Sequence, residues 1–325
     1  MCSRFVVEGS RQNLATVQSR IPAELAACGE KVAAPYLVVG ADSLVGGSLI
    51  RALQTAGQGV VGTTRRRASM GPGRFYLDFQ DTESYRLPVP ASYAFIVAAA
   101  TNYDRCETDP SARKINVEQT PRLVESLLSQ GLFVTLISTN SVFGGERPWP
   151  HEEDPHDARI AYAIQKHEAE TLAFTAARAL GALDRFSVIR LTKVLAQETP
   201  PLHSWLQAWR KGRSIEPFSD LIFAPMSVQF VGNALATIGV KRVPGCLHLS
   251  GAANVSYVDL AKAYAASLGV DESLISASSA KAKGIHIAYK PTYSGLGMDK
   301  TTRLTGVRPQ PLDQVVRDLT RGFTL

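Results

Sequence analysis

The stretch Tyr36-Leu-Val-Val-Gly40-Ala-Asp-Ser43-Leu-Val-Gly46-Gly47 decides the fold class of this chain. It begins with a short apolar run, which is typical of a strand buried in a parallel sheet. A glycine-containing turn and a helical pattern over residues 43–56 follow directly. A strand joined to a helix in this way points free backbone N–H groups at a phosphate, so the stretch predicts a dinucleotide-binding turn.

Individual residues of this turn have separate expected roles. Gly40 permits the tight turn, and Gly46 lets the helix pack close to the strand. Ser43 stands where a G-x-x-G-x-x-G motif has its middle glycine, so we expect a longer approach to the phosphates. We expect Asp42 and Leu44 to line the same cofactor site. The motif alone is weakly specific, because glycine turns are common in α/β proteins.

Strands and helices continue to alternate after this turn. Alternation of this kind predicts the α/β class: a Rossmann, doubly wound parallel sheet with helices on both faces. The expected strands are 59–64, 93–98, 133–138 and 186–190, and the expected helices lie around 111–130 and 161–180.

The chain divides into three expected parts. Residues 1–33 look like an N-terminal extension with a weak helical pattern, and residues 34–195 form the NADP-binding Rossmann domain. Four prolines between positions 200 and 225 interrupt the alternation. Residues 196–325 are therefore expected to form mainly a smaller substrate-binding lobe. Segments near 222–250 are expected to return to the Rossmann domain, and a strand at 246–250 is followed by a helix at 256–268.

Bulk properties narrow the class further. The chain has 325 residues, of which 45% are hydrophobic and 20% charged, as in ordinary globular proteins. No apolar stretch approaches the roughly 18 to 20 residues that cross a bilayer, and the start does not resemble a secretory signal. We expect a cytoplasmic protein with no membrane partner. The four cysteines and six histidines show no metal-ligand spacing, so no metal is expected.

The net charge of +6 permits an anionic partner. Basic residues occur in two short clusters, at 65–67 and 210–213, rather than in one long run. Short clusters favour local phosphate sites over a nucleic-acid-binding face, so no nucleic-acid partner is expected.

The end of the second strand indicates the dinucleotide. NAD sites place an acidic residue there, about 20 residues past the turn, to bind the ribose 2′-hydroxyl. Here Thr64 takes that place, and Arg65 and Arg66 follow it. Arginines can clamp a 2′-phosphate with forked, charge-assisted hydrogen bonds, so NADP(H) is expected in preference to NAD(H). A basic loop exposed to solvent is the alternative.

A catalytic group is expected at the carboxyl edge of the sheet. Tyr162 and Lys166 are one helical turn apart and so face the same side. A lysine ammonium stabilises a phenolate and can hold the nicotinamide ribose. Thr139 follows a buried strand and is placed to bind a substrate carbonyl oxygen. A Tyr-x-x-x-Lys sequence often arises by chance on exposed helices. The glycine turn, a hydroxyl at the end of a strand and the Tyr–Lys pair occurring together are far more specific.

Aromatic and basic residues of the second half suit a nucleotide. Trp209 and Arg213 belong to a segment that could bind a base and its diphosphate. The alternative is that the tryptophan packs in the core of the lobe and the cations are solvated.

Several further motifs resemble the extended short-chain dehydrogenases, and within them the dTDP-4-dehydrorhamnose reductase (RmlD-like) group. The resemblance runs from about residue 36 to the C-terminus. It is carried by Ala98-Ala-Ala-Thr101-Asn-Tyr-Asp104-Arg-Cys-Glu107, by Ser138-Thr139 with Val142-Phe143, and by Met298-Asp299-Lys300 with Gly306.

The resemblance implies roles for individual residues. Thr139, Tyr162 and Lys166 would be catalytic, and the last two would also hold the cofactor. The other residues that the resemblance places at the cofactor are Asp78 at the adenine, Ala98, Ala99 and Ala100 along it, Asn116 beneath the site, and Leu191. Thr101, Asn102, Tyr103 and Asn140 would face the substrate, with Trp209 and Arg213 beyond them.

The implied reaction is hydride delivery from NADPH to the 4-keto group of a nucleotide-linked 6-deoxyhexose, in surface polysaccharide biosynthesis. Residues 189–194 differ from the aromatic-containing segment of the group, so the resemblance does not specify which sugar is the substrate. Asn140-Ser141 stand where the related 4,6-dehydratases carry an acidic pair, which disfavours dehydration. A nucleotide-sugar epimerase and a non-catalytic NADP-binding regulatory subunit remain alternatives, and family analogy suggests a homodimer.

Overall fold

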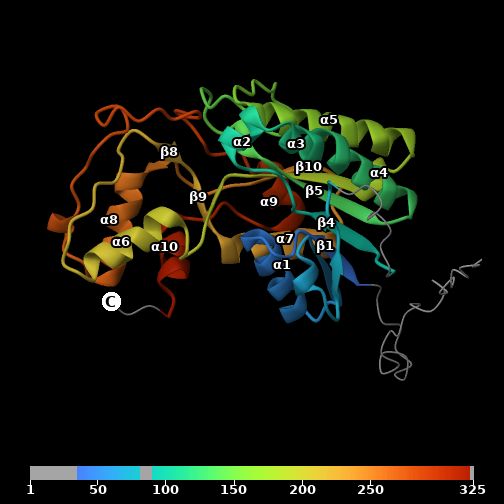
Figure 1. Cartoon of the computed structure of the whole chain (residues 1–325), viewed down its shortest axis with the longest axis horizontal. Helices are drawn as coiled ribbons and strands as arrows, with labels where there is room; N and C mark the ends of the chain where they lie inside the picture. The colour runs from blue at the N-terminus through green and yellow to red at the C-terminus, as the bar shows by residue number, and fades with distance from the viewer. Residues whose placement is uncertain (1–34, 81–89, 323–325) are drawn as a thin grey trace, which may run out of the picture. The chain divides into compact units, whose positions relative to one another are not determined.

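The computed structural model describes residues 35–80 and 90–322 (Figure 1). The extension expected at residues 1–33 lies outside the described residues. Within the described part of the chain, no helix is both long and apolar enough to span a membrane.

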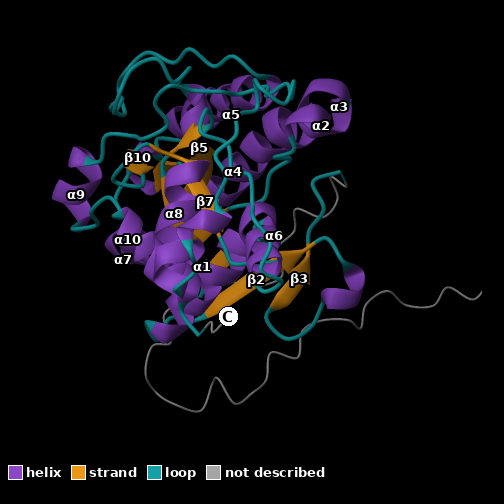
Figure 2. Cartoon of the chain, turned by 90° about the vertical axis from the view of Figure 1, so that its left-hand side faces the viewer, coloured by secondary structure: helices purple, strands orange, loops and turns teal. Residues whose placement is uncertain are grey.

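A seven-stranded sheet forms the centre of the structure. All its pairings are parallel, in the order β10-β6-β5-β4-β1-β2-β3. β10 and β3 stand at opposite edges (Figure 2). The expected Rossmann architecture is confirmed, and β3 is a strand that the sequence pattern did not predict. The strands are β1 (Tyr36–Val39), β2 (Val60–Thr64), β3 (Arg74–Tyr76), β4 (Tyr93–Ile96), β5 (Phe133–Thr139), β6 (Phe186–Leu191) and β10 (Gly245–Leu249).

Helices cover both faces of this sheet (Figure 1). α1 (Leu44–Thr55) and α7 (Val228–Lys241) pack on one face, where Leu49 and Leu235 share a core with Phe95 of β4. α4 (Thr120–Ser129) and α5 (Ala161–Ala179) cover the other face. The central strands β1, β4, β5 and β6 are wholly buried because both of their faces are covered, which explains their continuous apolar runs.

The helix expected around 111–130 is divided. α2 (Tyr103–Thr108) and α3 (Pro110–Arg113) precede a π-helical segment, η4 (Lys114–Gln119), which leads into α4. Pro121 lies in the first turn of α4 and has no N–H to donate to the preceding turn. A regular α-helical hydrogen bond is therefore missing at that point, and the preceding turn widens. Such π-helical turns occur frequently at functional sites.

The second half forms a lobe with its own core. Pro200 and Pro201 do not end a regular pattern but begin α6 (Pro200–Trp209), since proline is tolerated in the first helical turn. α6 packs with α8 (Tyr257–Leu268) and α10 (Leu312–Thr320), and Trp205, Trp209 and Tyr264 fill the space between them.

Ser256 caps α8 and forms a reciprocal capping box with Asp259, so this helix begins close to the expected residue 256. The remaining short elements are β7 (Lys193–Leu195), β8 (Ile222–Phe223), β9 (Pro225–Ser227), β11 (Val255–Ser256) and α9 (Asp299–Thr305), with single 3₁₀ turns η2 (Arg67–Ser69), η5 (Asn140–Val142), η6 (Leu183–Arg185) and η7 (Glu272–Leu274).

Candidate active site

The turn between β1 and α1 has the geometry of a phosphate-binding turn. Gly40 has φ of +94°, a conformation that favours glycine, and a Cβ on Gly46 would collide with the carbonyl oxygen of Gly40. Ser43, which replaces a glycine, is the N-cap of α1: its Oγ accepts from the Gly46 amide (3.0 Å) and donates to the Gly40 carbonyl (2.8 Å). The serine therefore tightens the turn with its own side chain.

A cavity of about 520 Å³ opens beside this turn. It brings together residues of β1, β2 and the segment after β4, which meet because the carboxyl ends of parallel strands lie at one edge of the sheet. The expected cofactor residues that line it are Gly40, Asp42, Ser43, Thr64, Arg65, Arg66, Asp78, Ala98, Ala99 and Ala100.

A second cavity of about 840 Å³ shares part of this wall, including Ser43, Ala99 and Thr101. It extends from the sheet edge to the second lobe, where Phe223 and Tyr257 form its far side. The expected site residues that line it are Ser43, Leu44, Ala99, Thr101, Asn102, Tyr103, Thr139, Asn140, Tyr162, Lys166 and Leu191.

Thr139, Tyr162 and Lys166 meet in this second cavity, although they come from β5 and α5. Thr139 Oγ1 shares a hydrogen bond with Ser141 Oγ at 3.0 Å, and its side chain lines the cavity together with that of Tyr162. Lys166 Nζ donates to the backbone carbonyl of Ile137 at 2.7 Å, which fixes the lysine against β5. The ring of Tyr103 stacks on that of Tyr162, with centroids 5.5 Å apart.

Burial changes the acidity of both titrating groups. It raises the pKa of Tyr162 above its ordinary value, and the neighbouring Tyr103 adds to that effect. It lowers the pKa of Lys166 to about 8, although the charge of Glu170 opposes this. Lys166 is only 2% exposed, so its ammonium gains little from water. The site therefore combines a phenol that stays protonated at neutral pH with a lysine near its titration point.

Asn116 supports the wall of the cavity from the π-helical segment. Its Oδ1 accepts from the Ala100 amide and its Nδ2 donates to the Ala100 carbonyl, both at 2.9 Å. Nδ2 also donates to Gln165 of α5. Asn116 therefore links the segment after β4 to the helix that carries Tyr162. Asn116 does not line either cavity, so its position is that of a supporting residue.

Trp209 and Arg213 are not brought to either cavity. Trp209 is 6% exposed and packs against Trp205 and Tyr264 in the core of the second lobe. Arg213 is an exposed residue after the end of α6. Trp209 therefore belongs to the core of the second lobe and Arg213 to its surface, in place of the nucleotide site expected for them.

Other residues take the place opposite the catalytic group. Segment 286–291 lines the cavity, and Tyr289 Oη donates to the Phe143 carbonyl at 3.2 Å. Asn140 Nδ2 donates to the carbonyl and the hydroxyl of Ser294, at 2.9 and 3.0 Å. Lys193 also lines the cavity. Residues 286–290 were not predicted from the sequence, because they belong to no helix or strand and have no periodic pattern.

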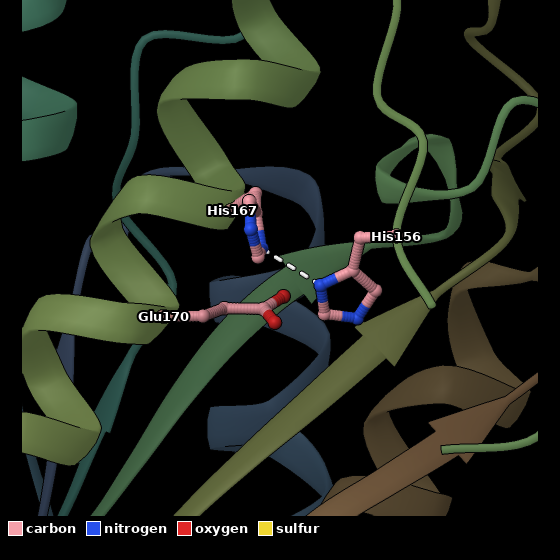
Figure 3. Close-up of side chains that lie close together, drawn as sticks. All are labelled: His156, His167 and Glu170. Carbon is pink, nitrogen blue, oxygen red and sulfur yellow. Dashed lines mark hydrogen bonds between the residues drawn. The ribbon is translucent and has the colours of Figure 1, made fainter. Parts of the chain in front are cut away.

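His156, His167 and Glu170 form a cluster in which His167 and Glu170 extend from α5 and His156 comes from the loop before it (Figure 3). The two histidines share a hydrogen bond between their Nδ1 atoms, 2.7 Å apart. Arg190 binds both oxygens of Glu170, with Nη2–Oε2 of 2.8 Å. Since a guanidinium already takes up the carboxylate, the arrangement fits a structural tie between the 143–160 segment and α5 better than a metal site. The sequence spacing gave no indication of this histidine pair.

The fold and this site define a class: an NAD(P)-dependent oxidoreductase of the extended short-chain dehydrogenase/reductase type. The chain belongs to the RmlD substrate binding domain family, which it matches over residues 35–324. No curated protein sequence matches it significantly.

Solved structures share the fold. The dTDP-4-dehydrorhamnose reductase of Clostridium acetobutylicum is 18% identical with a TM-score of 0.73, covering 88% of this chain and 98% of its own. The dTDP-4-dehydrorhamnose reductase of Yersinia enterocolitica is 19% identical with a TM-score of 0.72, covering 87% and 98%. MoeE5, solved in complex with UDP-glucuronic acid and NAD, is 21% identical with a TM-score of 0.72, covering 88% and 99%.

Proposed function

We propose that this protein is an NADPH-dependent reductase that acts on a nucleotide-linked 4-keto-6-deoxysugar in surface polysaccharide biosynthesis. The observation that carries the proposal is that Thr139, Tyr162 and Lys166 share one cavity, whose wall continues into the phosphate-binding turn. Two solved structures of the same fold are dTDP-4-dehydrorhamnose reductases. The RmlD family match supports the same substrate class.

The residues of the site suit a nicotinamide dinucleotide. The close approach of Gly46 to Gly40, which excludes a Cβ, leaves the N-terminus of α1 open to a pyrophosphate. When bound, the nicotinamide supplies the hydride. Arg65 and Arg66 line the cavity beside the end of β2, where they can meet a 2′-phosphate, and this supports the choice of NADP(H).

Each catalytic side chain has a distinct task in ketone reduction. Tyr162 donates its proton to the substrate oxygen, and its raised pKa keeps that proton in place until reduction. Thr139, which lines the same cavity, donates its one hydroxyl proton in a second hydrogen bond to the same oxygen. The ammonium of Lys166 stabilises the phenolate that forms and can bind the nicotinamide ribose.

The experiment is oxidation of NADPH, followed by its near-ultraviolet absorbance, over a panel of nucleotide-linked 4-keto-6-deoxysugars. Turnover is expected with at least one of them. It should fall by about 10²- to 10⁴-fold in Tyr162→Phe, which keeps the ring but has no proton to donate. Tyr264→Phe, which makes the same change in the core of the second lobe and outside both cavities, is the matched control and should retain most activity.

Two other results would redirect the assignment. Interconversion of two nucleotide sugars without net use of the dinucleotide would indicate an epimerase. Tight NADPH binding with no turnover of any member of the panel, and no difference between wild type and Tyr162→Phe, would indicate a regulatory subunit.

A further inference from the structure

Asp42 of the phosphate-binding turn is joined to the end of β2 by a short network. Its Oδ2 accepts a hydrogen bond from Thr64 Oγ1 at 2.5 Å. Arg66 donates from Nε to the same oxygen at 3.2 Å. Arg74 of β3 pairs with the other oxygen, with Nη1–Oδ1 of 2.5 Å. Both oxygens of this carboxylate thus have partners at the edge of the cofactor cavity.

The position of this carboxylate is informative. Thr64 is the last residue of β2, the place from which NAD-binding folds extend an acidic side chain to the ribose 2′-hydroxyl. Asp42 brings a carboxylate to the same place from the preceding turn, and Asp42, Thr64 and Arg66 all line the same cavity. The sequence hides this because the acid comes 22 residues earlier in the chain than Thr64.

Asp42 is ionised at neutral pH. Partial burial by itself would raise its pKa, but the Thr64 hydrogen bond and the charges of Arg66 and Arg74 lower the pKa below its usual value. The carboxylate also occupies Arg66, one of the two arginines that follow β2 and line the cavity. A dianionic 2′-phosphate must therefore compete with Asp42 for Arg66 and approach a negative charge, whereas a 2′-hydroxyl can donate to that carboxylate.

We propose that Asp42 is a specificity-determining residue of the cofactor site, which limits the preference for NADP(H) and allows NAD(H) to bind. This inference rests on the proposed dinucleotide site. The carboxylate that distinguishes the two dinucleotides then comes from the turn between β1 and α1 and not from the end of β2. Arg66 supplies the opposing interaction with the phosphate.

The test is the ratio of the NADH and NADPH dissociation constants, measured by fluorescence titration of the full-length protein. In Asp42→Asn, which keeps an oxygen for Thr64 but has no charge, the ratio should shift toward NADPH by at least about tenfold. Asp42→Ser should shift it in the same direction, which guards against a folding defect particular to one variant. The shift toward NADPH should disappear in the double variant Asp42→Asn/Arg66→Gln, because the arginine that the first substitution releases is then missing.

Asp313→Asn is the matched control. It removes one carboxylate from an exposed Asp313–Arg317 pair on α10, so it changes the net charge equally without touching the cavity. An unchanged ratio in both Asp42 variants, or an equal shift in the control, would overturn the role of Asp42 while leaving the reductase proposal intact. A wild-type protein that binds neither dinucleotide would overturn both.

Discussion

Arg190 and Glu170 form an ion pair with an Nη2–Oε2 distance of 2.8 Å, and their side chains are only 4% and 3% exposed. The pair joins β6 to α5, the helix that carries Tyr162 and Lys166. Arg190 also donates to the Glu152 carbonyl at 3.1 Å, so the same guanidinium fixes the segment that leads into α5.

Removing one partner of this pair should destabilise the protein. In Glu170→Ala the Arg190 guanidinium stays buried without its counter-ion, which is expected to lower the free energy of unfolding by about 3 to 5 kcal/mol. Urea unfolding measures the change. Asp313→Ala breaks an exposed Asp–Arg pair and should cost no more than about 1 kcal/mol. Equal losses of unfolding free energy in the two variants would show that the buried pair stabilises the protein no more than the exposed pair does.

Two adjacent glycines of α1 should respond differently to alanine. Gly46→Ala places a Cβ against the Gly40 carbonyl, so the turn must open, and we expect NADPH to bind at least about tenfold more weakly. Gly47→Ala meets nothing closer than 3.7 Å, and an alanine favours the helix. Its unfolding free energy should rise by about 0.4 to 1 kcal/mol with NADPH binding unchanged. Equal binding by the two variants in the same titration would contradict the proposed turn.

The lowered pKa of Lys166 predicts a pH dependence of reduction. The ammonium is lost near pH 8 rather than near pH 10.5, so kcat/KM for NADPH should fall as the pH rises through about 8. Tyr162 stays protonated over this range because its pKa is raised. In Lys166→Arg the guanidinium does not deprotonate, and the fall should disappear even if the overall rate is lower. A fall at the same pH in this variant would assign the titration to another group.

The His156–His167 pair predicts a loss of stability in acid. Burial, with a further contribution from Arg190, lowers the pKa of His156 to about 4 from 6.5. Between these values the unfolded chain binds a proton that the folded protein does not, so His156 destabilises the fold progressively as the pH falls from 6.5 toward 4. The expected slope is about 1.4 kcal/mol per pH unit.

His156→Asn, which keeps a polar atom near the place of Nδ1 but does not titrate, should show a correspondingly smaller slope. Urea unfolding of both proteins at several pH values between 7 and 4 measures the difference. Parallel curves would show that His156 does not carry this dependence.

Much of the candidate site could be predicted from the sequence because its signals are local. Tyr162 and Lys166 are related by one helical turn, and Thr139 ends a strand whose apolar run marks it as buried. Gly40 and Gly46 lie in or beside the single turn that joins β1 to α1, so their positions follow from adjacent residues. Each of these signals extends over a few residues, the range within which backbone conformation and side-chain direction follow from sequence.

The prediction for Trp209 shows where such reasoning ends. An aromatic residue beside basic ones is as compatible with a nucleotide site as with a lobe core. Only the packing of α6 against α8 and α10, which buries Trp209 against Tyr264, distinguishes the two.

The sequence by itself determined the parallel α/β fold, which follows from periodicity, and it predicted the candidate phosphate-binding turn and the proposed Thr139–Tyr162–Lys166 group from short spacings and a family resemblance. The tertiary structure alone decided that Asp42 meets Arg74, that His156 meets His167, and that segment 286–291 faces the catalytic group. These contacts join segments that are distant in the chain. They depend on how whole elements pack, and no local pattern of residues encodes which loops become neighbours when that packing is complete.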